Sequence, residues 1–321
     1  MVCVTPPDTD VLIIGGGPAG LTAALALARQ LQSSVVFDNG DYRNKPSEDM
    51  HMVLTHDHAS PIDFRAKSKE NILSRYGTVS YEETTILTAK KTDAGTFEVE
   101  DDNGRIWQGK KLILATGVRD IFPAIEGYAE CWTKGIFPCF FYKGYEVRDS
   151  ESSGILAVEA MTDIPLAMHA ARHATPLSKQ ITIYTHGNQE LAKQFEEAFC
   201  NAPQFRADAR KIRRFVKGFS KANVVIHFED GSEVTEGFLG HRTLTKAKGP
   251  FAEQLGIATT PTGDLVVNPP FMQTNIGGVF AAGDNSQFTK FLGCAQYTGN
   301  LVGTGVSAQL LAEAIGQPGF I

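Results

Sequence analysis

One stretch of the chain, from Asp10 to Asp38, constrains the fold more than any other part of the sequence. A short apolar run, Val11 to Ile14, leads directly into Gly15-Gly16-Gly17-Pro18-Ala19-Gly20, and a segment with helical spacing of apolar residues follows. A strand, a glycine turn and a helix in this order are the context that makes G-x-G-x-x-G informative. The alternative is an ordinary strand-to-helix turn that merely needs glycine. We interpret the stretch as a dinucleotide-binding βαβ unit.

The small residues of this turn have separate physical tasks. Gly15 permits the tight turn, Gly17 lets the backbone approach a pyrophosphate, and Gly20 lets the helix pack close to the strand. The phosphate charge would sit on free N–H groups at the start of the helix. A second strand, Val35 to Phe37, ends in Asp38, whose carboxylate could accept hydrogen bonds from ribose hydroxyls. The predicted binding residues of this unit are Gly15, Gly17, Pro18, Ala19, Gly20 and Asp38.

Composition excludes several classes of protein. The hydrophobic fraction of 42% and the charged fraction of 21% are typical of a soluble globular chain. A net charge of −6 leaves no basic footprint for nucleic acid. No apolar run is long enough to cross a membrane, and the first residues lack the pattern of a secretory signal, so a cytoplasmic location is the default expectation. The cysteines form neither a disulfide framework nor a metal-binding C-x-x-C: Cys3, Cys131, Cys139, Cys200 and Cys294.

A second βαβ unit is predicted downstream, but its phosphate turn is altered. An apolar run, Ile155 to Val158, precedes a helix expected from about Ile164, and no glycine lies between them. Glu159 and Asp163 occupy the turn instead, so a pyrophosphate would meet negative charge. The strand at 180–184 is followed by no arginine that could bind the 2′-phosphate of NADPH. We therefore expect the fold of a nucleotide-binding unit without a nicotinamide site.

A histidine-rich segment, HMVLTHDHASP, follows the first unit and admits two interpretations. His51, His56 and His58 cluster there with Asp57. His56 and His58 would point the same way only on a strand. No further soft ligand lies nearby, so we favour a loop lying over a bound cofactor and predict no metal site.

Several motifs together resemble a known family of flavoproteins. GGGPAG at 15–20, ATG at 115–117 and GVFAAGD at 278–284 resemble the two-dinucleotide-binding-domain flavoproteins, and the size and domain order look like low-molecular-weight thioredoxin reductases. Over most of its length the chain is similar to the fungal gliotoxin-type dithiol oxidases. The stretches that carry this similarity are 37–65, 130–146 and the C-terminal segment with Gly283-Asp284.

The resemblance implies an architecture, a cofactor and an assembly. It implies an α/β fold of two Rossmann-like units, with an FAD domain at 1–120 and 239–321 and a degenerate NADPH-like domain inserted at 121–238. FAD would be the cofactor, and such proteins are usually homodimers. Pyrophosphate would lie on the glycine turn, the adenosine ribose at Asp38 and the ribityl chain at Asp284. The remaining residues implied at the cofactor are Arg43, Asn44, His51, Ala115, Thr116, Gly117 and Gly283.

The sequence departs from the family at its redox motif. The family has C-x-x-C, whereas this chain has Cys139-Phe140-Phe141-Tyr142, so the cysteine that would face the flavin is replaced by Tyr142. A dithiol relay needs one sulfur to attack and another to resolve. Cys131 or Cys294 could substitute in space, which sequence alone does not decide. Cys139 is expected to be an inert relic in an apolar setting.

Two classes of chemistry follow from this departure. In the first, an FAD-dependent oxidase acts directly on a small molecule, of secondary metabolism by analogy with the fungal relatives, and O₂ reoxidises the flavin. Tyr142 would then donate a hydrogen bond or act as acid or base, and Lys143 would lower its pKa by charge. Alternatively, Tyr142 only fills volume and Lys143 reaches solvent.

The second class keeps thiol chemistry, with Cys139 pairing to another sulfur, and a third hypothesis is a non-catalytic FAD-binding partner protein. Gln296 is the candidate for a polar contact near the pyrimidine end of the flavin; its alternative is a helix residue that faces solvent.

Overall fold

The computed structural model describes residues 9–319 and divides the chain into two compact units. Unit 1 is discontinuous and is formed by Met1–Arg119 and Thr245–Ile321, whereas unit 2 is the continuous segment Asp120–Leu244. The connecting strands β7 (Val118–Ile121) and β16 (Leu244–Ala247) pair with each other. Within the described residues, no helix is long and apolar enough to cross a membrane.

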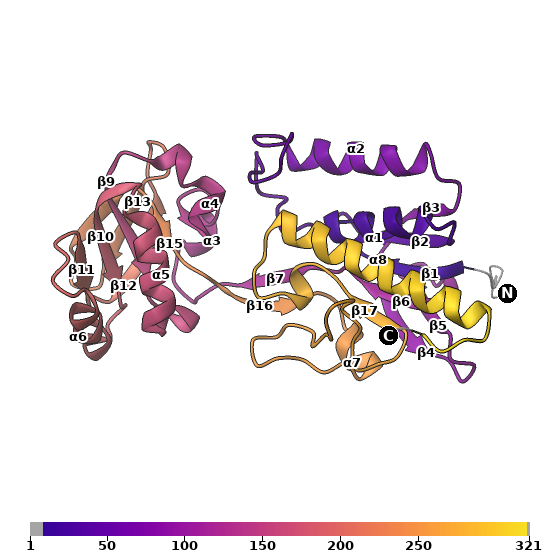
Figure 1. Ribbon diagram of the computed structural model, residues 1–321. Coiled ribbons are helices and arrows are strands. Elements are labelled where there is room, and N and C mark those ends of the chain that lie inside the picture. The colour runs from indigo at the N-terminus through magenta and orange to yellow at the C-terminus, as the bar shows by residue number, and fades with distance from the viewer. Residues whose placement is uncertain (1–8, 320–321) are drawn as a thin grey trace. The chain divides into compact units, whose positions relative to one another are not determined.

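Unit 1 is built on a sheet with the strand order β3-β2-β1-β6-β5-β4, in which β17 also pairs with β6 (Figure 1). The pairs around β1 are parallel, and β4, β5 and β6 form an antiparallel meander. Val11, Leu12 and Ile13 are fully buried, as expected for a parallel strand covered on both faces. The strands are β1 (Thr9–Ile14), β2 (Ser34–Asp38), β3 (Val79–Glu83), β4 (Ile86–Lys91), β5 (Phe97–Asp101), β6 (Ile106–Leu114) and β17 (Val279–Ala281).

Two helices from opposite ends of the chain lie side by side in unit 1 (Figure 1). They are α1 (Pro18–Ala28) and the long C-terminal helix α8 (Leu292–Ala314). Glycines make the close approach possible, because a Cβ at Gly299 would overlap the carbonyl oxygen of Ala19 and one at Gly303 would lie 2.6 Å from the Cβ of Ala26. The other helices are α2 (Pro61–Leu73) and the short α7 (Phe251–Leu255).

Unit 2 contains a parallel sheet with the order β11-β10-β9-β15-β8 and a separate antiparallel sheet of β12, β13 and β14. Helices α5 (Ile164–Ala174) and α6 (Gln189–Ala198) pack on the parallel sheet, and α3 (Tyr128–Cys131) and α4 (Phe140–Lys143) are single turns. The strands are β8 (Ile136–Phe137), β9 (Ser150–Leu156), β10 (Ser178–Tyr184), β11 (Phe205–Asp208), β12 (Ile212–Lys217), β13 (Val224–Phe228), β14 (Glu233–Glu236) and β15 (Leu239–Gly240).

The predicted α/β fold of two Rossmann-like units is confirmed, with one correction to a boundary. The chain returns to unit 1 at Thr245, later than the predicted 239. The physical reason is that Leu239 and Gly240 pair with β8 and β9 and so complete the parallel sheet of unit 2.

Candidate functional site

In the turn after β1, close contacts with backbone atoms require glycine at two positions, whereas a side chain would meet no protein atom at a third. Gly15 has a φ of +118°, and a Cβ there would overlap the carbonyl oxygen of Ala115. A Cβ at Gly20 would overlap the carbonyl oxygen of Gly15. A Cβ at Gly17 would meet nothing within 4 Å. Gly15 and Gly20 therefore fix the turn, and Gly17 leaves space for a ligand on its outer side.

The N-terminus of α1 has the properties of an anion site. Gly17 is its N-cap, no side chain caps it, and its first turn contains no acidic residue. The first N–H groups of a helix have no partner within the helix and carry the positive end of its dipole. Pro18 occupies the position where a missing N–H costs least. The turn thus fits a pyrophosphate, as the sequence predicts.

Asp38, at the end of β2, is the centre of a buried polar cluster. It is 6% exposed, and its Oδ1 accepts the N–H of Gly40 at 3.0 Å, while its Oδ2 accepts the hydroxyls of Tyr42 and Tyr81. Burial and the bond to Asp38 raise the pKa of Tyr42 to about 12 and raise that of Tyr81 as well. Both phenols therefore stay protonated donors, and Oδ1 keeps capacity for a ribose hydroxyl.

A pocket of about 490 Å³ opens beside this cluster, and its lining includes Gly16, Asp38 and Arg65. The guanidinium of Arg65 lies 3.8 Å above the ring of Tyr42 and donates to Oδ1 of Asn44 at 2.9 Å. Arg65, Tyr42 and Tyr81 were not predicted as site residues from the sequence. Tyr81 could be found only from the register of the sheet, in which it is paired with Val36 of β2.

Arg43 and the turn at 283–285 come together in the structure. Arg43 Nη1 lies 3.0 Å from Oδ2 of Asp284. Asn285 donates to Oγ1 of Thr116 at 3.2 Å and to the carbonyl of Leu114 at 2.9 Å, which attaches this turn to the one after β6. The structure thereby gathers the predicted segments at 15–20, 115–117 and 283–284 at one edge of the sheet.

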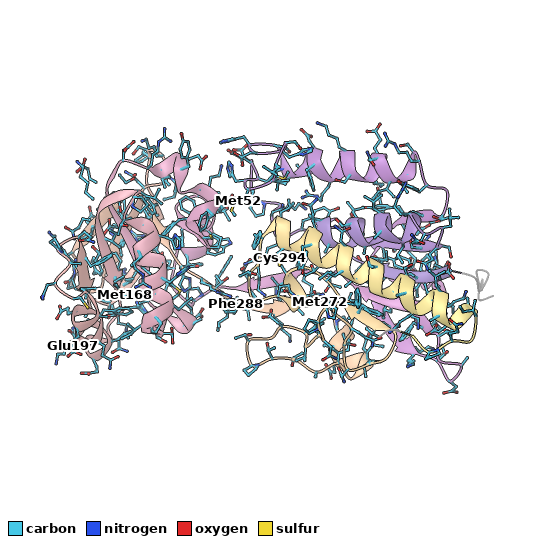
Figure 2. All side chains as sticks on the ribbon, viewed as in Figure 1. Met52, Met168, Glu197, Met272, Phe288 and Cys294 are labelled. Carbon is cyan, nitrogen blue, oxygen red and sulfur yellow. The ribbon has the colours of Figure 1, made fainter. Side chains whose placement is uncertain are left out.

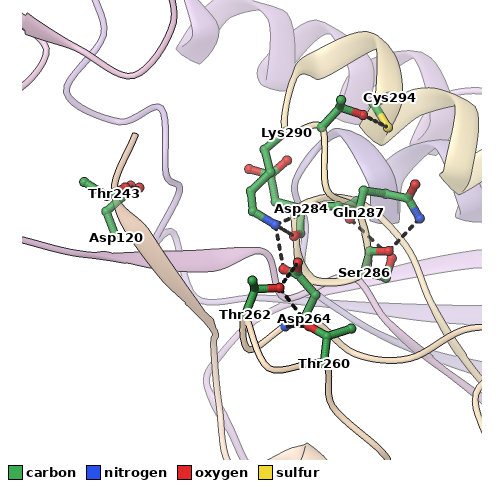
Figure 3. Close-up of polar contacts among 12 residues, drawn as sticks. Asp120, Thr243, Thr260, Thr262, Asp264, Asp284, Ser286, Gln287, Lys290 and Cys294 are labelled. Atoms are coloured by element: carbon green, nitrogen blue, oxygen red, sulfur yellow. Dashed lines mark hydrogen bonds and ion pairs between the residues drawn. The ribbon is translucent and has the colours of Figure 1, made fainter. Parts of the chain in front are cut away.

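Lys290 holds the Asp284 turn and was not foreseen from the sequence (Figure 3). Its ammonium contacts Oδ1 of Asp264 at 2.6 Å and donates to the carbonyls of Asp284 at 2.8 Å and Gln287 at 2.6 Å. Both side chains of the ion pair are about nine-tenths buried. No local pattern signals this contact, because Asp264 and Lys290 belong to separate loops. Gln296 lies half-buried in α8, and its role stays a prediction.

The redox segment lies at α4 in unit 2. Cys139 is the N-cap of α4 and is exposed, so the expectation that it is buried and inert for that reason is wrong. Tyr142 is half-buried with its ring edge-on to Phe137 at 6.2 Å, and the ammonium of Lys143 lies 5.8 Å from the Tyr142 ring. Phe140 is buried on the inner side of this turn, whereas Phe141 and the sulfur of Cys139 are exposed.

The other cysteines differ sharply in environment. Cys131 is fully buried, and burial raises the pKa of its thiol to about 11. Burial also raises the pKa of Cys294, which lies in the first turn of α8 in unit 1 (Figure 2). Cys200 is exposed, and all four cysteines among residues 9–319 are free thiols. Cys3 lies outside the described residues.

The turn of unit 2 that corresponds to the glycine turn is closed by protein groups. Oδ1 of Asp163 accepts the N–H of Leu166 at 2.9 Å and so caps α5. Burial raises the pKa of Glu159, which lies in the short 3₁₀ turn after β9. At the end of β10, Nδ1 of His186 accepts the N–H of Ile212 at 3.2 Å, and burial lowers its pKa.

Comparisons with known proteins show the family of the chain. The model of the pyridine nucleotide-disulphide oxidoreductase family matches residues 9–155. The chain is 48% identical to thioredoxin reductase tcpT of Claviceps purpurea, with 96% of each chain covered. The chain belongs to the thioredoxin reductase family. It is also 41% identical to thioredoxin reductase aclD of Aspergillus oryzae over 95% of this chain and 97% of that protein.

Two solved structures share the fold over almost the whole chain. A putative thioredoxin reductase from Bacillus anthracis has a TM-score of 0.85 at 25% identity, with 96% of this chain and 100% of that chain covered. An oxidoreductase from Agrobacterium tumefaciens has a TM-score of 0.84 at 29% identity, with coverage of 95% and 99%. This member of the family is an FAD-dependent oxidoreductase, and the glycine turn, the Asp38 cluster and the uncapped α1 of unit 1 fit that cofactor.

Proposed function

We propose that the protein is an oxidase that acts directly on a small-molecule substrate, without NADPH and without a C-x-x-C dithiol. The substrate loses two electrons and two protons, and O₂ takes up both pairs to become hydrogen peroxide. FAD supplies the two-electron exchange between them. The substrate is proposed to be a secondary metabolite, by analogy with the fungal relatives, and the active form to be a homodimer.

The observation that carries this proposal is the capped N-terminus of α5. The Asp163 carboxylate already accepts the Leu166 N–H, at the helix end where a nucleotide pyrophosphate would bind. A second anion there would face the charge of Asp163 at close range and would have to displace it from the helix. The helix end is therefore poorly suited to the pyrophosphate of NADPH.

The adenosine 2′-phosphate would also lack a receptor at the end of β10. Burial lowers the pKa of His186, so its imidazole is neutral at neutral pH. Its Nδ1 already accepts the backbone N–H of Ile212. Arg210 is held by Asp208 at 2.5 Å, and Lys211 is paired with Glu229 at 2.8 Å. Arg210 and Lys211 thus form ion pairs with carboxylates of unit 2 itself.

Substitution of the second motif cysteine by Tyr142 supports direct action on the substrate. The phenol replaces a resolving thiol, so a relay confined to 139–142 has one sulfur and cannot form its internal disulfide. We propose that Tyr142 donates a hydrogen bond or moves a proton during substrate oxidation, with Lys143 close to its ring.

Anaerobic spectroscopy of the purified flavoprotein tests the proposal. NADPH should leave the flavin absorbance unchanged, and photoreduced flavin should recover its absorbance within minutes of mixing with air while peroxide forms in equal amount. Rapid bleaching by NADPH would overturn the interpretation of the α5 turn. Flavin that stays reduced in air would assign the electrons to an acceptor other than O₂.

The exposed thiol of Cys139 favours a second candidate, oxidation of thiols or reduction of disulfides through a mixed disulfide. The names of the relatives state the latter activity for those proteins. Oxygen consumption with dithiothreitol as the probe separates the two. Cys139→Ser should abolish consumption if a mixed disulfide forms, and the exposed Cys200 provides the matched Cys200→Ser control. If Cys139→Ser keeps activity and Tyr142→Phe loses it, direct action on the substrate is favoured.

A further inference from the structure

The histidine-rich segment of unit 1 folds back on itself and brings distant members of the segment together. The N–H of Met50 bonds the carbonyl of Ala59 at 2.9 Å, and the N–H of His58 bonds the carbonyl of Met50 at 3.0 Å. Within the loop, the N–H of Met52 bonds Oδ1 of Asp57 at 3.0 Å; Met52 marks this loop in Figure 2. The closure places His51 beside His58, a pairing different from the His56 and His58 pair considered from the sequence.

Three ligand-type side chains converge as a result. Nδ1 of His51 lies 3.4 Å from Oδ1 of Asp57, and Nε2 of His58 lies 3.4 Å from Oδ2 of the same carboxylate. The two imidazole rings are edge-on, with centroids 4.6 Å apart. One ligand atom from each residue lies within 4.8 Å of the other two. One carboxylate thus sits between two imidazole nitrogens.

The distances fit a shared cation better than direct bonds between the side chains. Charge-assisted N–H···O bonds are about 2.7–2.9 Å long, so 3.4 Å is long for such a bond. Ligands about 2.0–2.2 Å from one tetrahedral Zn²⁺ lie roughly 3.3–3.5 Å from each other. Each imidazole nitrogen lies in that interval from one oxygen of the carboxylate, His51 from Oδ1 and His58 from Oδ2. A rotation of the exposed Asp57 carboxylate would bring one oxygen toward both nitrogens, which lie within 4.8 Å of each other.

We propose that His51, Asp57 and His58 bind one divalent cation of the zinc type, with the fourth position open to water. Imidazole and carboxylate together suit Zn²⁺ and its neighbours in the first transition row rather than Mg²⁺ or Ca²⁺. The ion joins residue 51 to residues 57 and 58 and so closes the loop a second time, through side chains. The proposal does not rest on the proposed oxidase activity, because neither the α5 turn nor the redox segment contributes to the site. His51 is shared with the residues that the resemblance implies at the cofactor, so the tests substitute Asp57 and His58 instead.

His56 provides a matched control in the same loop. Its Nδ1 contacts Oγ1 of Thr55 at 2.9 Å, and its ring packs edge-on to Phe64 at 5.4 Å. The His56 ring is therefore engaged by Thr55 and Phe64 rather than by the three converging side chains. A second control is His169, whose ring packs edge-on to His173 along α5 in unit 2 with ring centroids 4.5 Å apart and forms a separate histidine pair.

Titration of tag-free flavoprotein with Zn²⁺ and Co²⁺ tests the site. Calorimetry should give one tightly bound Zn²⁺ per chain. Bound Co²⁺ should show the visible spectrum of a tetrahedral site without a thiolate charge-transfer band. The absence of that band excludes the exposed cysteines as ligands. Asp57→Asn and His58→Gln should each weaken Zn²⁺ binding at least about tenfold. His56→Gln and His169→Gln should change it less than twofold.

The variants are chosen to keep the fold. Asn at 57 retains an oxygen that can accept the Met52 N–H, and the His58 side chain is 60% exposed. An unchanged melting temperature and unchanged flavin content confirm this. Absence of stoichiometric Zn²⁺ binding by the wild-type protein overturns the proposal, as does equal loss in the control variants or a thiolate band in the Co²⁺ spectrum.

Discussion

The two βαβ units share a fold but differ in how the helix after the first strand begins. After β1, the helix begins at Gly17 with no side-chain cap, so its N–H groups face open space. After β9, the helix begins at Asp163, whose carboxylate binds the Leu166 N–H. The apolar strands maintain each sheet without a ligand, whereas the ligand chemistry depends on a few residues in the turn. The parallel sheet of unit 2 therefore forms without the glycine turn that follows β1 in unit 1.

The largest expected effect comes from substituting the glycine turn of unit 1. Gly15→Ala places a Cβ against the Ala115 carbonyl at a φ of +118°, so we expect loss of FAD and of much of the stability of unit 1. Gly17→Ala meets no protein atom within 4 Å, so that variant should fold and lose only FAD affinity. Flavin absorbance after dialysis and thermal melting distinguish the two. Equal melting temperatures for both variants would contradict the packing argument.

The buried ion pair under the Asp284 turn should rank second. Lys290→Met leaves the Asp264 carboxylate buried without its cation, which should cost about 3 kcal/mol or more. Chemical denaturation measures this change, and the double variant with Asp264→Asn should recover part of it. A loss below about 1 kcal/mol would mean that the turn is held chiefly by Arg43 and Asn285.

In unit 2 the expected effect is pH-dependent. Burial lowers the pKa of His241, at the end of β15, from 6.5 to about 4. The unfolded chain therefore takes up a proton between about pH 6.5 and pH 4 that the folded chain does not, so stability falls as pH decreases through this window. The loss should approach about 3 kcal/mol at pH 4. His241→Asn should reduce the slope in urea denaturation across this window; an unchanged slope would assign it to other groups.

The smallest expected effect comes from removing the Asp163 side chain that caps α5. Asp163→Ala should cost about 1 kcal/mol, because one N–H of α5 loses its acceptor. Asn188→Ala removes the equivalent cap of α6 and is the matched control. Neither variant should bind NADPH, because the glycines and the phosphate-binding arginines are also missing. NADPH binding by the Asp163→Ala protein would show that the cap alone had closed the site.

Local patterns predicted the fold well because each βαβ unit carries its signal in adjacent residues. The glycine turn, the apolar strands and the acid at position 38 are all close in sequence. The site was less predictable where it depends on contacts between separate segments. Tyr81 reaches Asp38 through sheet register, and Lys290 reaches Asp264 from another loop. The exposure of Cys139 was mispredicted because neighbouring phenylalanines indicate burial of a segment but not which side of a single turn faces inward.

The pairing of α1 with α8 has a consequence for biosynthesis. Unit 2 is continuous, so all of its contacts can form once Leu244 has left the ribosome. Unit 1 contains α1 and α8, the first and last helices of residues 9–319, so its core is incomplete until α8 has been made. The inserted unit should therefore acquire protease resistance on stalled ribosomes before the unit that encloses it in sequence. Cofactor loading must then await synthesis of the Asp284 turn and α8, which follow unit 2 in the chain.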